Sequence, residues 1–161
     1  TMELSSVRVS FPNDAGIIIG QSHFIKTVED LYEAMVTSCP GIRFGVAFAE
    51  ASGPCLVRRD GNDDELVETA VRAVADVGAG HTFAIGLRGG YPINVLSAVK
   101  GCQEVCSVFC ATSNPVEVVV AQSAQGRGIL GVIDGSSPKG VEDDAEASKR
   151  RSFLRTIGYK R

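Results

Sequence analysis

The sequence lacks an excess of basic residues, has no long apolar run and contains only two histidines among its 161 residues. Its formal net charge of -3 argues against a nucleic-acid-binding protein, because such proteins present a basic face. No stretch approaches the roughly 20 apolar residues of a transmembrane helix, and no signal-peptide pattern opens the chain. We therefore expect neither nucleic acid nor membrane as a partner.

Motifs for disulfides and metal ions are also missing. Five cysteines are an odd number, and a chain of this length folds without disulfide bonds. We therefore expect free thiols in a reducing cytoplasm. Cys102, Cys106 and Cys110 recur every four residues, which is not the C-x-x-C spacing of zinc sites. We interpret buried cysteines of this kind as small hydrophobic residues and expect no structural metal.

The composition is typical of a folded globular protein, with 44% hydrophobic and 22% charged residues. Thr1 precedes Met2, and we expect it to be foreign to the native chain. The length suits one domain, which we place over residues 2–161.

Apolar stripes at helical spacing, bounded by capping residues, predict four helices. Thr27 and Asn62 stand at predicted N-cap positions, with Asp30 and Glu65 in the capping-box places three residues later. Gly78 follows the second stripe as a predicted C-terminal stop. The predicted helices cover residues 27–36, 62–80, 91–101 and 142–158.

Eight short apolar runs between these helices predict β-strands. Several of the runs are continuously apolar, as expected for strands covered on both faces. Helices separate some strands and tight turns join others, which indicates an α/β fold: a single-domain, layered, mixed β-sheet with helices on both faces. The predicted strands cover residues 5–11, 16–21, 43–50, 54–59, 81–87, 105–111, 116–122 and 128–134.

Small, polar or charged residues follow four of the predicted strands, at residues 50–53, 88–90, 112–114 and 134–137. Ligands in α/β sheets gather beyond the carboxyl ends of parallel strands, so these segments would line a shared pocket. The same residue types are the usual turn formers, and ordinary turns are the alternative interpretation.

The glycine-rich segment 125–142 looks suited to phosphate but matches no phosphate-binding motif. A P-loop fails because Lys139 is followed by glycine, and the G-x-G-x-x-G spacing from Gly126 to Gly131 precedes a strand instead of opening a helix. Glycines still permit close approach of the backbone to an anion, and Arg127 could hold a phosphate by two parallel hydrogen bonds. A glycine-rich hairpin with one exposed arginine is the alternative.

The two histidines are the candidate nucleophiles. His81 begins a predicted strand after a glycine-rich break, and His23 precedes a predicted helix. Neither has a serine or cysteine in a recognisable triad context. A neutral imidazole is a competent phosphoryl acceptor near neutral pH, so either could be modified, and a purely structural role is the alternative.

Several blocks of the sequence resemble one small protein family. They include "GQSHFIKTVEDLYEA", "GNDDELVETA", "GHTFAI", "YPINVL", "FCATSNPVEV" and "QGRGILGVIDGSSPKGVE". Together these blocks are similar to the adenosine-specific kinase family, found largely in archaea and some thermophilic bacteria, and the likeness runs from Gly20 to the end of the chain. The resemblance implies a layered α/β fold, a homo-oligomer built from trimers, a site for adenosine or AMP instead of ATP, and a histidine able to carry a phosphoryl group.

We place the expected site on these motifs. His81, with His23 as the fallback, would accept the phosphoryl group, and Asp134 or Glu50 would act as base or orient a ribose hydroxyl. Arg127 would hold phosphate, with Lys139 as its rival. The full expected ligand-binding set is Glu50, Ser52, Gly53, Asn94, Thr112, Asn114, Gly126, Arg127, Gly128, Gly131 and Lys139.

One conflict remains within this assignment. His81 begins its strand, whereas the other site residues lie at strand ends, and in a parallel sheet these positions lie at opposite ends of the strands. Antiparallel strands, a histidine from a neighbouring subunit or a structural histidine would each resolve it.

Three functions fit this sequence. The first is a nucleoside phosphotransferase, the second is an adenosine or AMP sensor without turnover, and the third is a structural oligomer.

Overall fold

The structure is a computed structural model that describes residues 1–161, with eight strands and four helices. Their order is β1 (Glu3–Val9), β2 (Gly16–Ser22), α1 (Thr27–Ser38), β3 (Arg43–Ala49), β4 (Val57–Gly61), α2 (Asp64–Val77), β5 (Thr82–Arg88), α3 (Pro92–Lys100), β6 (Val105–Thr112), β7 (Val116–Gln122), β8 (Arg127–Asp134) and α4 (Asp144–Thr156). All predicted helices and strands are present, and the α/β class is confirmed.

The strands form two antiparallel sheets, whereas the sequence predicted one mixed sheet. A five-stranded sheet has the order β4-β3-β5-β2-β6, and a three-stranded sheet has the order β1-β7-β8. Every pairing in both sheets is antiparallel. The difference arises because strand direction depends on how connections cross the molecule, and residue patterns within a strand do not reveal it.

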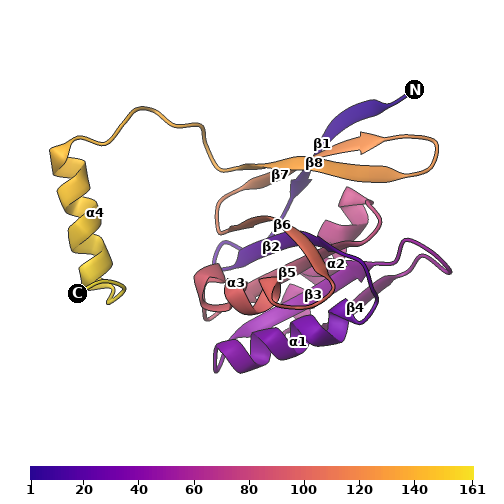
Figure 1. Ribbon diagram of the computed structural model, residues 1–161, viewed down its shortest axis with the longest axis horizontal. Coiled ribbons are helices and arrows are strands. Elements are labelled where there is room, and N and C mark those ends of the chain that lie inside the picture. The colour runs from indigo at the N-terminus through magenta and orange to yellow at the C-terminus, as the bar shows by residue number, and fades with distance from the viewer.

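Helices cover both faces of the five-stranded sheet, as predicted (Figure 1). On one face α1 and α3 pack on large side chains, including Phe44, Phe48 and Phe83. On the other face α2 and the inner side of β7 pack on smaller residues such as Ala47 and Ala84. The three-stranded sheet therefore lies across the same face as α2.

Glycines allow α2 to lie close to the five-stranded sheet. A Cβ atom on Gly45 would lie 2.1 Å from the backbone nitrogen of Val67, and one on Gly86 would lie 3.4 Å from the carbonyl oxygen of Leu66. The first separation is far shorter than any van der Waals contact, so a side chain at position 45 would push the helix away.

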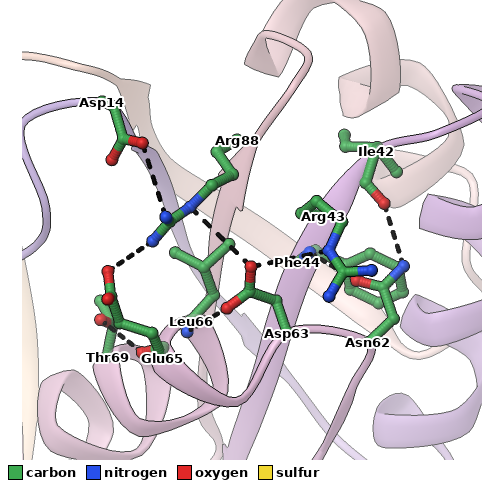
Figure 2. Close-up of polar contacts among 10 residues, drawn as sticks. All are labelled: Asp14, Ile42, Arg43, Phe44, Asn62, Asp63, Glu65, Leu66, Thr69 and Arg88. Atoms are coloured by element: carbon green, nitrogen blue, oxygen red, sulfur yellow. Dashed lines mark hydrogen bonds and ion pairs between the residues drawn. The ribbon is translucent and has the colours of Figure 1, made fainter.

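A polar network anchors the start of α2 and corrects the predicted cap (Figure 2). Asp63 is the N-cap, and its carboxylate accepts a hydrogen bond from the backbone N–H of Leu66 at 3.3 Å. Asn62 instead serves the sheet, because its amide bonds the carbonyl of Ile42 and the N–H of Phe44. The side chain therefore completes β3 and is not available to the helix.

Arg88, which follows a predicted strand, belongs to this network. Its guanidinium forms ion pairs with Asp14, Asp63 and Glu65, so Glu65 closes no capping box (Figure 2). These contacts tie the loop before β2 and the first turn of α2 to the end of β5.

The predicted capping box of α1 is absent as well. Lys26, and not Thr27 as predicted, is the N-cap; Thr27 is the first helical residue, and its hydroxyl donates to the carbonyl of Phe24 at 2.6 Å. Asp30 forms an ion pair with Lys26 instead of reaching back to the cap. A preceding turn runs directly into the helix and supplies its first acceptors, so no side-chain cap is needed.

The C-terminal arm, residues 135–161, separates from the rest of the molecule. An extended segment follows β8, and α4 lies apart from both sheets (Figure 1). Ala147 is the only buried residue of α4. None of the four helices is long and apolar enough to cross a membrane.

All five cysteines have free thiols. Cys110 is buried, and burial raises the pKa of its thiol to about 11, as suits a small hydrophobic residue. Cys106, four residues earlier in the same strand, is exposed, although strict alternation along a strand would place both cysteines on one face. A register shift between β2 and β6 breaks the alternation between them.

Candidate functional site

The antiparallel sheet places the start of β5 beside the end of β3. The backbone N–H of His81 donates to the carbonyl of Ala49 at 2.8 Å, and Glu50 follows immediately. The start of β5 and the end of β3 therefore lie at the same end of the sheet. Antiparallel strands, one of the three expected alternatives, bring His81 and Glu50 together within one chain. We call this the His81 end of the five-stranded sheet.

A cleft of about 670 Å³ opens at the His81 end. The loop between β3 and β4, the loop before β5 and the β7–β8 hairpin form its walls, and both hairpins project from the same side of the molecule (Figure 1). Its lining residues are Met2, Gln21, Glu50, Ala51, Cys55, Gly78, Gly80, His81, Ala121, Ser123, Gln125, Gly126, Arg127, Gly128 and Leu130.

His81 has an unusual backbone conformation and a free side chain. Its φ of 63° lies in the left-handed region, which non-glycine residues rarely adopt and which concentrates at functional sites. The imidazole stacks on Phe48 with ring centroids 5.6 Å apart. No hydrogen bond within the chain involves its ring nitrogens, so both are available to a ligand in the cleft.

The backbone around His81 is held tightly despite this conformation. Its carbonyl accepts from Ser22 at 3.0 Å, in addition to the bond that its N–H makes with Ala49. A Cβ atom on the preceding Gly80 would lie 2.9 Å from Cβ of Ala51. The main chain therefore fixes the position of the imidazole, and a side chain at position 80 would force Ala51 to shift.

Arg127 lies in the cleft, but most of its donors are already used. Its Nη1 donates to the carbonyls of Asp76 and Val77 at 3.2 and 3.3 Å, and its Nε donates to Gln122 at 2.9 Å. The side chain therefore caps the C-terminal end of α2, where a positive charge is favourable. Only Nη2 has no partner within the chain. Nη2 alone is therefore free to contact a phosphate, whereas the sequence predicted two parallel hydrogen bonds from the guanidinium.

Glu50 is the one acidic residue of the cleft, and both of its oxygens are engaged. Arg58 donates to one at 2.7 Å, and the backbone N–H of Leu56 donates to the other at 2.9 Å. The hydrogen bond from Arg58 lowers the pKa of Glu50 below its ordinary value. A carboxylate so stabilised is a weak base, and its visible role is to close the β3–β4 hairpin.

The glycines of the β7–β8 hairpin have no steric requirement from the chain itself. Gly126 and Gly128 have ordinary backbone angles, and a Cβ atom at either would meet nothing within 4 Å. Glycine inside a strand often marks close approach by a ligand or by another backbone. The empty space beside these residues is therefore open to a group from outside this chain.

Three expected site residues lie at the opposite end of the sheet. Thr112 and Asn114 both donate to one carboxylate oxygen of Asp134, at 2.8 and 3.2 Å. This cluster joins the β6–β7 turn to the end of β8, and it shares no cleft with His81. The single pocket expected from Glu50, Thr112 and Asn114 is therefore not formed, because β3 and β6 end on opposite sides of the molecule.

The remaining candidates are scattered. Asn94 caps α3 through the backbone N–H of Tyr91 at 2.8 Å, and Lys139 lies on the C-terminal arm. Ser52 and Gly53 lie in the β3–β4 loop beside the cleft but do not line it. His23 lies in the turn before α1 and does not line the cleft either. Gly131 lies on the outer side of β8.

Several cleft residues were not predicted from the sequence. Gln21 comes from the end of β2, Cys55 from the β3–β4 loop, and Ser123 and Gln125 from the tip of the β7–β8 hairpin. Only the hairpin residues had a local signal, since Gln125 begins the glycine-rich segment and Ser123 lies two residues before it. The others enter through strand pairing.

Comparison with known proteins agrees with the likeness in the motifs. A family model described as "Adenosine specific kinase" matches residues 7–160. The chain belongs to the adenosine-specific kinase family. The crystal structure of the PH1918 protein from Pyrococcus horikoshii OT3 is 39% identical, covers 100% of this chain and 99% of its own, and superposes with a TM-score of 0.96. No curated protein matches the chain.

Proposed function

We propose that the cleft binds adenosine and AMP and that His81 accepts a phosphoryl group, which makes the protein a nucleoside phosphotransferase. The observation that carries the proposal is the unbonded imidazole of His81 in a cleft lined by Arg127 and the hairpin glycines. His23 lies outside this cleft, which supports His81 as the modified residue. Family membership supports adenosine as the nucleoside.

The chemistry assigns a step to each group. A neutral ring nitrogen of His81 attacks the phosphorus of a donor, the bond to the donor's leaving oxygen breaks, and a phosphoramidate forms. The 5′-hydroxyl of adenosine then attacks that phosphorus and the P–N bond breaks. The released ring nitrogen takes up the hydroxyl proton, so AMP leaves with the neutral imidazole restored. The free Nη2 of Arg127 would stabilise charge on the transferring phosphoryl oxygens.

A second candidate is an adenosine or AMP sensor without turnover. The specific observation in its favour is Glu50, since the cleft's one acidic residue is bonded to Arg58 and has a lowered pKa. The other proposed base, Asp134, lies at the far end of the sheet. No cleft carboxylate is therefore positioned to take the proton of a ribose hydroxyl.

Incubation of the full chain with γ-labelled ATP and adenosine separates the two candidates. Transfer predicts labelled AMP and an acid-labile label on the protein, and His81→Asn should abolish both. Calorimetric binding of adenosine without labelled product would favour the sensor. Absence of binding by either adenosine or AMP would refute both.

The proposal also includes a cytoplasmic, trimer-based homo-oligomer. Family likeness supports the assembly, and five free thiols support a reducing compartment. Sedimentation that shows only monomer at micromolar concentration would contradict the assembly.

A further inference from the structure

The outer face of the three-stranded sheet is uncovered, and apolar side chains such as Leu4, Val119 and Ile133 lie on it beside Arg8 and Glu117. Val116, Val118 and Val120 of β7 are buried against α2 and the five-stranded sheet, so the alternate residues face outward. Leu4 on this outer side is 68% exposed and Ile133 is 48% exposed. A sheet face with such side chains ordinarily packs against another element.

A glycine outside the His81 cleft leaves room on this outer face for a helix to pack. A Cβ atom on Gly131 would meet nothing within 4 Å. Elsewhere in the same chain, α2 packs closely on the sheet where Gly45 and Gly86 remove side chains. The outer face of β8 likewise has a glycine where another element could pack closely, but no element of its own chain packs there.

The C-terminal arm also exposes apolar side chains that nothing in its own chain covers. Its helix, α4, has 13 residues and one buried side chain, whereas isolated helices shorter than about 12–15 residues are marginal in water. Phe153 is 59% exposed, and Ile157, one helical turn later, is 42% exposed. The preceding segment exposes Val141 almost fully. This helix needs an apolar partner.

The charges of the arm and the body are opposite. Residues 135–161 contain seven basic and four acidic side chains, a net charge of +3. Residues 1–134 contain nine basic and fifteen acidic side chains, a net charge of -6. These opposite net charges favour association of the arm of one copy with the body of another, without selecting a face.

The arm does not pack on either sheet of its own chain. It comprises 27 of 161 residues, and the superposition with the Pyrococcus crystal structure includes them. The TM-score of 0.96 counts the share of residues that superpose. A relative whose arm folded back on its own chain could not have matched so closely. The separation of the arm is thus shared with a protein whose structure was determined experimentally.

We propose that α4 packs on the outer face of the three-stranded sheet of a second copy of this chain. Phe153 and Ile157 would lie over Gly131, between the side chains of Leu4 and Ile133. An exchanged arm buries both uncovered surfaces without moving either, and it is a common route to homo-oligomers.

Complementary variants test this pairing by sedimentation and light scattering of the full chain at micromolar concentration. The arm variant carries Phe153→Asp and Ile157→Asp, and the face variant carries Leu4→Asp and Ile133→Asp. We expect the unmodified chain to be oligomeric and each variant to lose most of the oligomer. An equal mixture should regain heterodimers, because one intact arm then meets one intact face.

The control is Val36→Asp on α1, which introduces an aspartate at an apolar position that is 42% exposed but lies on neither proposed surface. It should leave the oligomer intact. A monomeric unmodified chain, an unaffected face variant or failure of the mixture to associate would each overturn the proposal.

Hydrogen exchange of the unmodified chain decides the matter if a variant misfolds. The amides of α4 should be protected at micromolar concentration and lose protection on dilution. Fast exchange in α4 at every concentration would refute docking.

Discussion

Replacement of Arg127 by alanine should weaken the fold and AMP binding by separate amounts. The side chain donates two hydrogen bonds to carbonyls at the end of α2 and one to Gln122. A cation at a helix C-terminus contributes about 0.3–1 kcal/mol, and one further hydrogen bond contributes about 0.5–1.5 kcal/mol. We therefore expect a loss of about 1–2 kcal/mol in the free energy of unfolding. At roughly 2–4 °C per kcal/mol, Tm should fall by about 2–8 °C.

The effect on ligands should be selective. A hydrogen bond from Nη2 to a phosphate is worth roughly 1.5–3 kcal/mol, which corresponds to about a tenfold to hundredfold weaker Kd for AMP. Adenosine has no phosphate, so its Kd should change little. Calorimetric titration with both ligands, well below Tm, measures the two changes.

Gln122→Ala is the matched control for Arg127→Ala. It removes the partner of Nε but keeps the guanidinium and both of its bonds to α2. Tm should fall slightly, and AMP binding should not change. Equal losses for AMP and adenosine in Arg127→Ala would refute a phosphate contact, and an unchanged Tm would refute the cap.

Three further outcomes follow from single side chains. Intact mass at neutral or alkaline pH should show an added phosphoryl group that His81→Asn loses and His23→Asn keeps; the reverse pattern would assign the modification to His23. Gly45→Ala should destabilise the fold by about 1–3 kcal/mol in chemical denaturation because it pushes α2 from β3, whereas Gly126→Ala, which meets open space, should have a much smaller effect. Burial raises the pKa of Glu104 above its ordinary value of 4.5, so its ionisation opposes folding. Unfolding curves should therefore show Glu104→Gln gaining stability over the unmodified chain as pH rises from 4.5, and a gap that stays constant or narrows would contradict this.

The buried Glu104 has a clear physical origin for that pH dependence. Its side chain is 2% exposed, both of its carboxylate oxygens lack a hydrogen bond, and the amine of Lys26 lies 3.8 Å away. Asp30 faces the same amine, and its hydrogen bond from Lys26 lowers the pKa of Asp30. Lys26 is therefore already paired, which leaves Glu104 with too little compensation for its burial.

Local patterns were sufficient for the elements of this protein. Helix positions follow from apolar spacing and from terminal residues such as Gly78, whose φ of 66° ends α2 as expected. Strand positions follow from apolar runs, because burial on both faces requires them. Motif likeness also identified the family, and it implied a modified histidine, for which His81 was placed first and His23 second.

Tertiary structure alone decided which candidates meet. Strand direction puts Glu50 beside His81 and sends Thr112 to the far end of the sheet, and no local pattern encodes that direction. Arg127 is bonded to carbonyls about 50 positions away in the sequence, and Asn62 serves β3 instead of the helix it precedes. Side chains of the same chemistry have different roles here because their partners come from distant segments, and only the packed chain brings those segments together.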